Sequence, residues 1–207
     1  METADNASPR KNRPAFIFLL LHPVASLHHI YRVLRTRWIL RQAGIVGGEN
    51  ARFLTRLAPR IENLGQIVVG DGLRIDCFSA PARIHCDPGA VIEFGSGVYV
   101  NSGALLFARK SIKVGDHTRF AEECYVCDTH FHALAPGEPA KTAPIVIGRN
   151  VWIGRRATLL PGITIGNHSV IGVGSIVSRD IPPRSVAAGT PARVLRTFEC
   201  PDDWIRE

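Results

Sequence analysis

The sequence lacks the features that mark disulfide-rich, membrane-spanning and disordered proteins. Its five cysteines are an odd number at scattered positions, so we expect no disulfide framework. The apolar run from Ala15 to Leu21 is followed by His22 and Pro23 and is too short to span a bilayer. The start of the chain does not resemble a signal peptide, because this run follows Pro14 and lacks a small-residue cleavage site. We therefore expect a cytoplasmic protein.

Acidic residues are outnumbered by basic ones. The 207 residues include 25 Lys and Arg against 18 Asp and Glu, which gives a net charge of +7. This excess favours an anionic partner, such as nucleic acid, an anionic membrane surface or a phosphate-rich cofactor, and charge alone does not choose among them. The hydrophobic fraction of 45% is that of an ordinary globular protein. The length suits one domain with a substantial core and an appendage.

We divide the chain into four parts. Residues 1–14 are expected to be disordered and residues 15–65 to form a basic, amphipathic helical segment. Residues 66–196 are expected to form a β-domain, and residues 197–207 a C-terminal tail.

A helix is expected from Ser26, its N-cap, to just before Gly44. At helical spacing Arg32, Arg35 and Arg41 lie away from an apolar face. That face consists of Leu27, Ile30, Tyr31, Leu34 and Trp38. Two interpretations stay open: the helix packs on its own β-domain or a neighbouring subunit, or it lies on an anionic membrane surface. The second would make the protein peripheral on the inner membrane face.

From about Gln66 onward the helical period is absent, and an aliphatic residue recurs at every sixth position. The clearest run is Ile147, Ile153, Leu159, Ile165, Ile171 and Val177, and the register returns upstream at Phe94, Val100, Leu106, Val114, Phe120 and Val126. A fixed internal period signals a stacked repeat, whereas an ordinary β-sandwich alternates with period two. Three six-residue units close one triangular coil, and stacked coils bury a continuous aliphatic column.

The register breaks between Val126 and Ile147, which predicts a loop extruded at about residues 127–146. A long loop inside a compact repeat is usually functional. This one contains Asp128, His130 and His132. A neutral histidine is suited to remove the proton of an attacking hydroxyl, so the loop is a candidate for general-base catalysis.

The run from Ile147 to Arg196 resembles the hexapeptide-repeat acyltransferases. Within them it is most similar to the branch of the galactoside, maltose and nodulation acetyltransferases and the polysaccharide O-acetyltransferases. The segment from Gly189 to Val194 is similar to the one that closes over CoA in those enzymes. The resemblance implies a left-handed parallel β-helix and a homotrimer with active sites between subunits. It also implies acetyl-CoA as co-substrate and a sugar or glycan acceptor, as in polysaccharide biosynthesis, with no metal and no nucleic acid.

The loop also resembles the Asp-x-Asp-aromatic-His motif of that family. Asp128, Phe131 and His132 fall on matching positions, while His130 stands where the second Asp is usual. His132 is therefore the expected base, His130 competes with it, and Asp128 is a candidate to orient it. By position, the residues implied to line the CoA groove are Arg155, Val173, Ser178, Arg179, Arg193 and Arg196. Asn101 matches an acceptor-contacting asparagine.

Other functions remain open on the residues alone. A γ-carbonic-anhydrase-like metalloenzyme needs three convergent histidines, of which His117 in the repeat is one candidate. A zinc knuckle would use Cys124 and Cys127 with the loop histidines, but the register places Cys124 in the core. Cys127 as an acyl-carrying nucleophile needs a depressed pKa. The remaining alternative is a non-catalytic β-helix scaffold.

Overall fold

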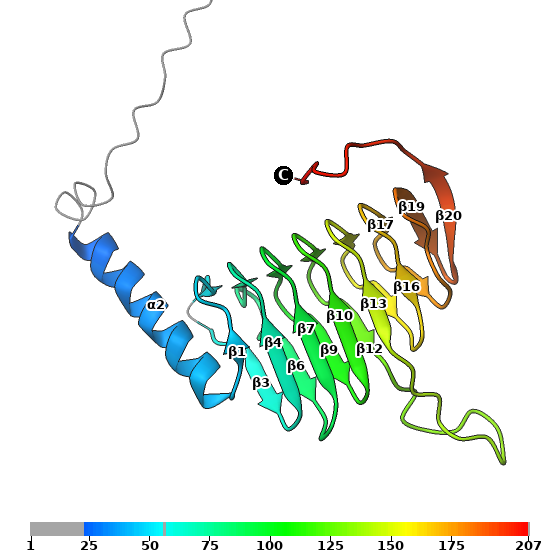
Figure 1. Ribbon diagram of the computed structural model, residues 1–207, viewed down its shortest axis with the longest axis horizontal. Helices are drawn as coiled ribbons and strands as arrows, with labels where there is room; N and C mark the ends of the chain where they lie inside the picture. Colours follow the sequence, from blue (N-terminus) through cyan, green and yellow to red (C-terminus); the bar gives the residue numbers. More distant parts are fainter. Residues whose placement is uncertain (1–22, 56, 207) are drawn as a thin grey trace, which may run out of the picture.

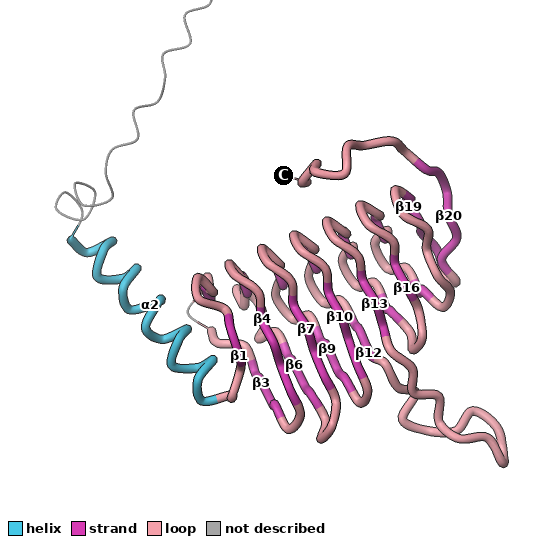
Figure 2. The backbone as a smooth tube through the Cα atoms, in the orientation of Figure 1, coloured by secondary structure: helices cyan, strands magenta, loops and turns pink. Residues whose placement is uncertain are grey.

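The protein is a left-handed parallel β-helix with an α-helix at its N-terminal end, as the repeat and the resemblance predict (Figures 1 and 2). The computed structural model describes residues 23–55 and 57–206. The terminus expected to be disordered at 1–14 and the apolar run at 15–21 lie outside the described residues. No helix in the described ranges is long and apolar enough to cross a bilayer.

Each coil passes through three parallel sheets, and each sheet stacks the equivalent strands of successive coils. The first sheet contains β1 (Val46–Gly47), β4 (Gln66–Val69), β7 (Val91–Phe94), β10 (Ser111–Val114), β13 (Ile145–Ile147) and β16 (Thr164–Ile165). The second contains β2 (Arg52–Phe53), β5 (Arg74–Ile75), β8 (Tyr99–Val100), β11 (Arg119–Phe120), β14 (Trp152–Ile153), β17 (Val170–Ile171), β19 (Ser185–Gly189) and β20 (Ala192–Thr197). The third contains β3 (Arg60–Asn63), β6 (Arg83–Cys86), β9 (Leu105–Ala108), β12 (Tyr125–Cys127), β15 (Thr158–Leu159) and β18 (Ile176–Val177).

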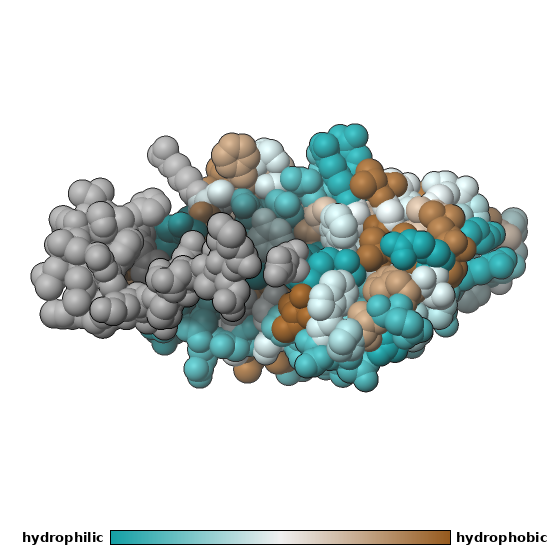
Figure 3. All heavy atoms as spheres, turned by 90° about the horizontal axis from the view of Figure 1, so that it is seen from above, coloured by the Kyte–Doolittle hydropathy of each residue, from teal (hydrophilic) through white to brown (hydrophobic). Residues whose placement is uncertain are grey.

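The predicted six-residue register forms the core. All twelve aliphatic and aromatic positions of that register are buried, and the parallel pairing places them above one another, as in Phe120 against Ile153 and Ile171. Each such side chain contributes roughly 1.5–3 kcal/mol by leaving water. Outward-facing side chains alternate with them, and the face seen in Figure 3 intersperses hydrophobic with hydrophilic residues.

Glycine recurs after the core positions because successive coils approach closely at the corners. A Cβ atom on Gly154 would lie 2.5 Å from the backbone oxygen of Ile171, and one on Gly166 would lie 2.3 Å from the nitrogen of Pro183. These glycines provide steric room, and neither has a positive φ. Residues with positive φ stand elsewhere in the corners, including Asn150 and His168.

The β-helix begins earlier than the boundary expected at residue 66. Strands β1, β2 and β3 already form a first coil, and β1 pairs with β4 in parallel. A six-residue search missed it because its first core position, aligned with Val69, is Gly47 and not an aliphatic residue, and because eight residues separate Phe53 from Ile61, the next position in register. Residues 46–65 therefore belong to the solenoid and not to the helical segment.

The helix α2 (Pro23–Gln42) begins three residues before the expected N-cap at Ser26. Proline is well suited to the first turn of a helix because it has no amide hydrogen to leave unpaired. The C-terminal end is as predicted: Gly44 has a φ of 62°, and the amide of Ile45 donates to the carbonyl of Leu40. This is a Schellman cap, in which glycine accepts the left-handed conformation.

The C-terminal residues close the other end of the solenoid. Strand β20 folds back antiparallel on β19, and the tail then runs back over the coils (Figure 1). Asn150 holds this tail, because its side chain donates to the carbonyl of Trp204 at 2.9 Å and accepts from the amide of Arg206 at 2.9 Å. The indole of Trp204 stacks over His168, with ring centroids 6.1 Å apart.

Candidate active site

The predicted loop leaves the solenoid after β12 and returns at β13, and it projects sideways from the coils (Figures 1 and 2). Its two legs are tied together at the base. The hydroxyl groups of Thr129 and Thr142 lie 2.9 Å apart, and the amide of His130 donates to the carbonyl of Lys141 at 2.9 Å. The amide of Gly162 donates to Ala143 at 3.1 Å. The loop is therefore attached to the coils on both sides.

Asp128 anchors the start of the loop. Its carboxylate is fully buried and accepts three backbone amides, from Arg109 at 2.8 Å and from Lys110 and Ser111 at 2.7 Å each. Within the described chain neither carboxylate oxygen bonds a histidine. The three amides fix the turn between β9 and β10. The role of Asp128 in orienting the base stays a prediction.

The two loop histidines stand in different environments. His132 is exposed, whereas His130 is partly buried. Between them Phe131 has a φ of 61° and packs edge-on against Phe107, with ring centroids 4.8 Å apart. Because Phe131 is held against the solenoid, the short segment that carries both imidazoles has a fixed attachment.

A cluster that the sequence did not reveal supports Phe107. The ring of His85 stacks on Phe107 at 4.4 Å, and its nitrogens contact Glu62 at 3.0 Å and Asp87 at 2.8 Å. The hydrogen bond from His85, with a weaker contribution from Arg109, holds the pKa of Asp87 below its usual range. The parallel register carries this signal, because Glu62, His85 and Phe107 are neighbours across β3, β6 and β9. His85 lies in the stretch where the six-residue spacing is irregular, which concealed that alignment.

The cysteines near the loop are buried and have the wrong acidity for a nucleophile. Burial raises the pKa of the Cys124 thiol to about 12, and its sulfur contacts the carbonyl of Ala121 at 2.9 Å. Burial also raises the pKa of Cys127, whose sulfur lies 3.1 Å from the carbonyl of Thr129. The Cys124 thiol faces the core, as the register predicted, whereas Cys127 pairs with the outward position of Phe107 and is buried outside the core column. In the described ranges no three His, Cys, Asp or Glu side chains converge as metal ligands would.

The residues implied to contact CoA and the acceptor lie on two corners of the solenoid and on the terminal hairpin. Ser178 and Arg179 follow β18, on the corner from which the loop also leaves; we call this the loop corner. Asn101 follows β8, and Arg155 and Val173 follow β14 and β17, on the corner between the second and third sheets; we call this the Asn101 corner. The amide of Gly174 donates to the carbonyl of Arg155 at 2.8 Å, so successive turns of this corner stack.

The side chains of this set differ in their availability. Val173 is 73% exposed, and the four side chains of Ser178, Arg179, Arg193 and Arg196 are also exposed. Arg155 instead contacts the carboxylate of Glu123 at 3.3 Å, beside Arg156. Asn101 is a corner residue whose side-chain oxygen accepts the amide of Ser102 at 2.7 Å. One chain thus presents the two corners separately and does not bring Asn101 to the loop histidines.

Comparison with known proteins places the chain in a family. A model described as bacterial transferase hexapeptide (six repeats) matches residues 144–179. A putative acetyltransferase of Saccharomyces cerevisiae, YJL218W, is 34% identical over 146 residues, which cover 68% of this chain and 74% of the yeast protein. The chain belongs to the hexapeptide-repeat acyltransferases. A solved structure of this family is that of a maltose O-acetyltransferase from Clostridium difficile 630, which is 30% identical to this chain. The two structures superpose with a TM-score of 0.56 over 79% of this chain and 74% of the Clostridium enzyme.

The galactoside O-acetyltransferase of Escherichia coli K12 is 40% identical to this chain over 116 residues, which cover 55% of the chain. The chain spans 57% of that enzyme's length and 63% of its Lactococcus lactis counterpart's length.

Proposed function

We propose that this protein transfers the acetyl group of acetyl-CoA to a hydroxyl group of a sugar or glycan precursor. One observation carries the proposal: a loop with two histidines is firmly attached to a rigid β-helix whose relatives include enzymes named galactoside and maltose O-acetyltransferases. A rigid support suits catalysis, because a base must be held in reach of the acceptor hydroxyl.

In this proposal His132 is the general base. Its neutral imidazole removes the proton of the acceptor hydroxyl as that oxygen attacks the thioester carbonyl. The carbon–sulfur bond then breaks, the CoA sulfur leaves as thiolate, and the imidazolium returns the proton to it. The exposure of His132 favours this assignment over the partly buried His130, because the base must meet an acceptor that arrives from solvent. A positioned base contributes roughly 10²–10⁴-fold to such a reaction.

The acyl donor is proposed to lie along the C-terminal coils. Arg179, Arg193 and Arg196 are exposed there, and guanidinium groups form charge-assisted hydrogen bonds with phosphates of the kind that CoA carries. Arg155 is less available, because it already pairs with Glu123. The raised thiol pKa values of Cys124 and Cys127 favour direct transfer over an acyl-cysteine intermediate.

The active site is proposed to form between copies of the chain in a homotrimer. The separation of the loop corner from the Asn101 corner supports this arrangement, because His132 and Asn101 then meet only when corners of two chains face each other. Closed rotational symmetry allows each copy to supply its loop corner to one neighbour and its Asn101 corner to the other.

The direct test is release of free thiol from acetyl-CoA in the presence of a panel of sugars, including galactosides and maltose. We expect acceptor-dependent release that His132→Ala lowers by at least 100-fold, while His130→Ala retains most of it. Asp180→Asn is a matched control, since this exposed carboxylate accepts a single backbone amide on the loop corner. Loss of activity in His130→Ala alone would reverse the assignment. Full activity in both variants would reject the loop as the catalytic element.

A further inference from the structure

The helix α2 packs on the solenoid through one side and leaves an apolar stripe on the other. The packed side contains Thr36 and Leu40, and the Thr36 hydroxyl accepts the amide of Phe53 at 3.1 Å. Arg35 also faces this way, with a hydrogen bond of 2.9 Å to the carbonyl of Thr55. The predicted apolar face is not the one that packs on the β-domain. It is exposed, and we call it the outward stripe: Leu27, Ile30, Tyr31, Leu34 and Trp38, between 44% and 67% exposed.

The outward stripe is a continuous surface along the helix. Positions 27, 31, 34 and 38 are separated by four, three and four residues, which places them on one line of an α-helix. Thr36 and Leu40 lie on the opposite side of the helix from this line. A contiguous apolar surface of this kind marks a contact with another molecule. The stripe ends in Trp38, an aromatic side chain typical of membrane interfaces.

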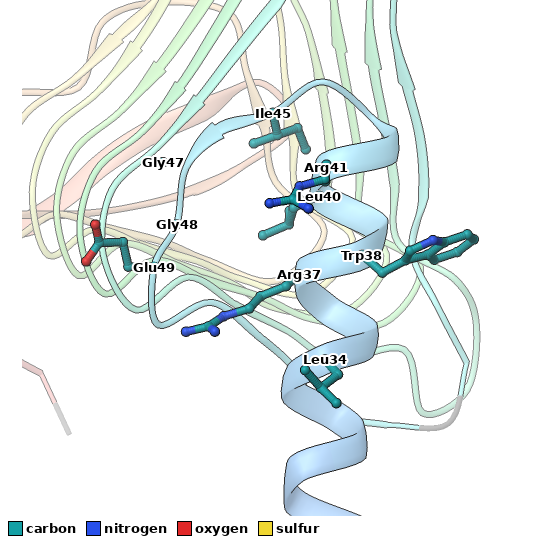
Figure 4. Close-up of a pocket in the computed structure, with 9 residues that line it drawn as sticks. All are labelled: Leu34, Arg37, Trp38, Leu40, Arg41, Ile45, Gly47, Gly48 and Glu49. Atoms are coloured by element: carbon teal, nitrogen blue, oxygen red, sulfur yellow. The ribbon is translucent and has the colours of Figure 1, made fainter.

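The charge of the same helix selects the partner. Between residues 23 and 48 there are four arginines and no Asp or Glu. Arg37 and Arg41, one turn apart, border a cleft of about 740 Å³ between α2 and the turn Gly47–Glu49, and Leu34 and Trp38 of the outward stripe line the same cleft (Figure 4). Neither forms an ion pair with Glu49 or any other carboxylate of the described chain. Their guanidinium groups are therefore available to an external anion.

An anionic lipid surface meets both features at once. Apolar side chains insert below the headgroups, while arginines flanking them reach the lipid phosphates with their charged ends. A two-fold contact between two copies of the stripe would instead oppose arginine to arginine, because the helix contains no acidic residue to pair with them.

We propose that the outward stripe and its flanking arginines bind the protein peripherally to a membrane surface rich in anionic lipid. Each arginine near such a surface contributes roughly 1 kcal/mol, which corresponds to about five-fold in partition. The attraction weakens with salt, because the Debye length is only about 10 Å at 0.1 M ionic strength. This proposal does not depend on the acetyl transfer.

The test uses the full chain with sedimented vesicles of phosphatidylcholine, either pure or containing about 30% phosphatidylglycerol. We expect binding to the anionic vesicles only, with release as salt rises. Arg37→Gln with Arg41→Gln should lower partition by about 25-fold, the product of two five-fold effects. A matched pair on the solenoid, Arg74→Gln with Arg83→Gln, should lower it much less. Because these side chains are exposed, the urea midpoints of all variants should equal that of the original chain.

Trp38 reports the contact directly once Trp152→Phe and Trp204→Phe have removed the other two tryptophans. Its emission should shift to shorter wavelength on anionic vesicles and be quenched by brominated lipid. Absence of binding, or binding with Trp38 left unquenched, would overturn the proposal. The double variant Leu34→Ser with Trp38→Ser gives a further check by sedimentation equilibrium. A lower number of subunits in this variant would show that a second copy of the chain covers the stripe, and it would also overturn the proposal.

Discussion

The buried carboxylate of Asp128 gives the sharpest quantitative prediction. In Asp128→Asn the side-chain oxygen still accepts amides, but the new NH₂ group faces at least one of the three backbone N–H donors. A hydrogen bond to a charged group is worth about 1.5–3 kcal/mol, and a buried donor left unpaired costs about 1–3 kcal/mol. Since one or two of the three bonds are lost, we expect the free energy of unfolding to fall by about 3 kcal/mol.

Thermal and urea unfolding measure this effect. For a chain of this length, about 3 kcal/mol corresponds to a fall in Tm of roughly 6–12 °C. Asp116→Asn is the matched control, because this exposed carboxylate accepts a single amide, that of Ser96 at 2.7 Å, and we expect a loss below about 1 kcal/mol. If Asp128→Asn unfolded like the original chain but lost acetyl transfer, the residue would act on the base and the anchoring role would be refuted.

Three further predictions follow from the coils and corners. Gly154→Ala should lower the free energy of unfolding by about 2–3 kcal/mol, because the new Cβ would overlap a backbone carbonyl. Gly174→Ala should lower it by about 1 kcal/mol, because the site is open but has a φ of 66°. Urea unfolding measures both losses. With a pKa of about 12, the Cys124 thiol should be thiolate to only about 10⁻⁴ at pH 8, so an aromatic disulfide reagent should label the part-exposed Cys200 first and Cys124 only on unfolding. Burial lowers the pKa of His168, so on acidification the unfolded chain binds a proton before the folded chain does, and the free energy of unfolding should fall as the pH drops below 6.5. Replacing His168 by asparagine, a residue that tolerates the positive φ at this position, should remove that fall between pH 8 and pH 5.

The regular part of the fold was predictable because one residue in six must fill a narrow core. Ile147 to Val177 follow that rule without interruption, and so the register, the loop between β12 and β13 and the inward position of Cys124 all followed from spacing. The first coil was not predictable in this way, because Gly47 takes the place of an aliphatic residue and the corner between Phe53 and Ile61 is longer than the period allows. The Gly44 cap was visible because only one residue type readily adopts its conformation.

The candidate site was predictable only as a list of residues. Spacing placed His130, His132 and Asp128 in one loop, but it did not show that the Asp128 carboxylate would be used by three backbone amides. The cluster around His85 depends on neighbours more than twenty residues apart, whose alignment requires the register of an irregular stretch. The outward stripe of α2 had the right composition for packing, yet Thr36 and Leu40 on the other side make the contact.

Subunit complementation tests the central claim most directly. His132→Ala removes the proposed base from the loop corner, and Asn101→Ala removes the proposed acceptor contact from the Asn101 corner of the neighbouring copy. Each variant alone should lose thiol release from acetyl-CoA. Randomly mixed in equal amounts, the two should regain activity at about one quarter of the sites, since half of the loop corners and half of the Asn101 corners are intact. No recovery in mixed oligomers would contradict a site built between copies of the chain.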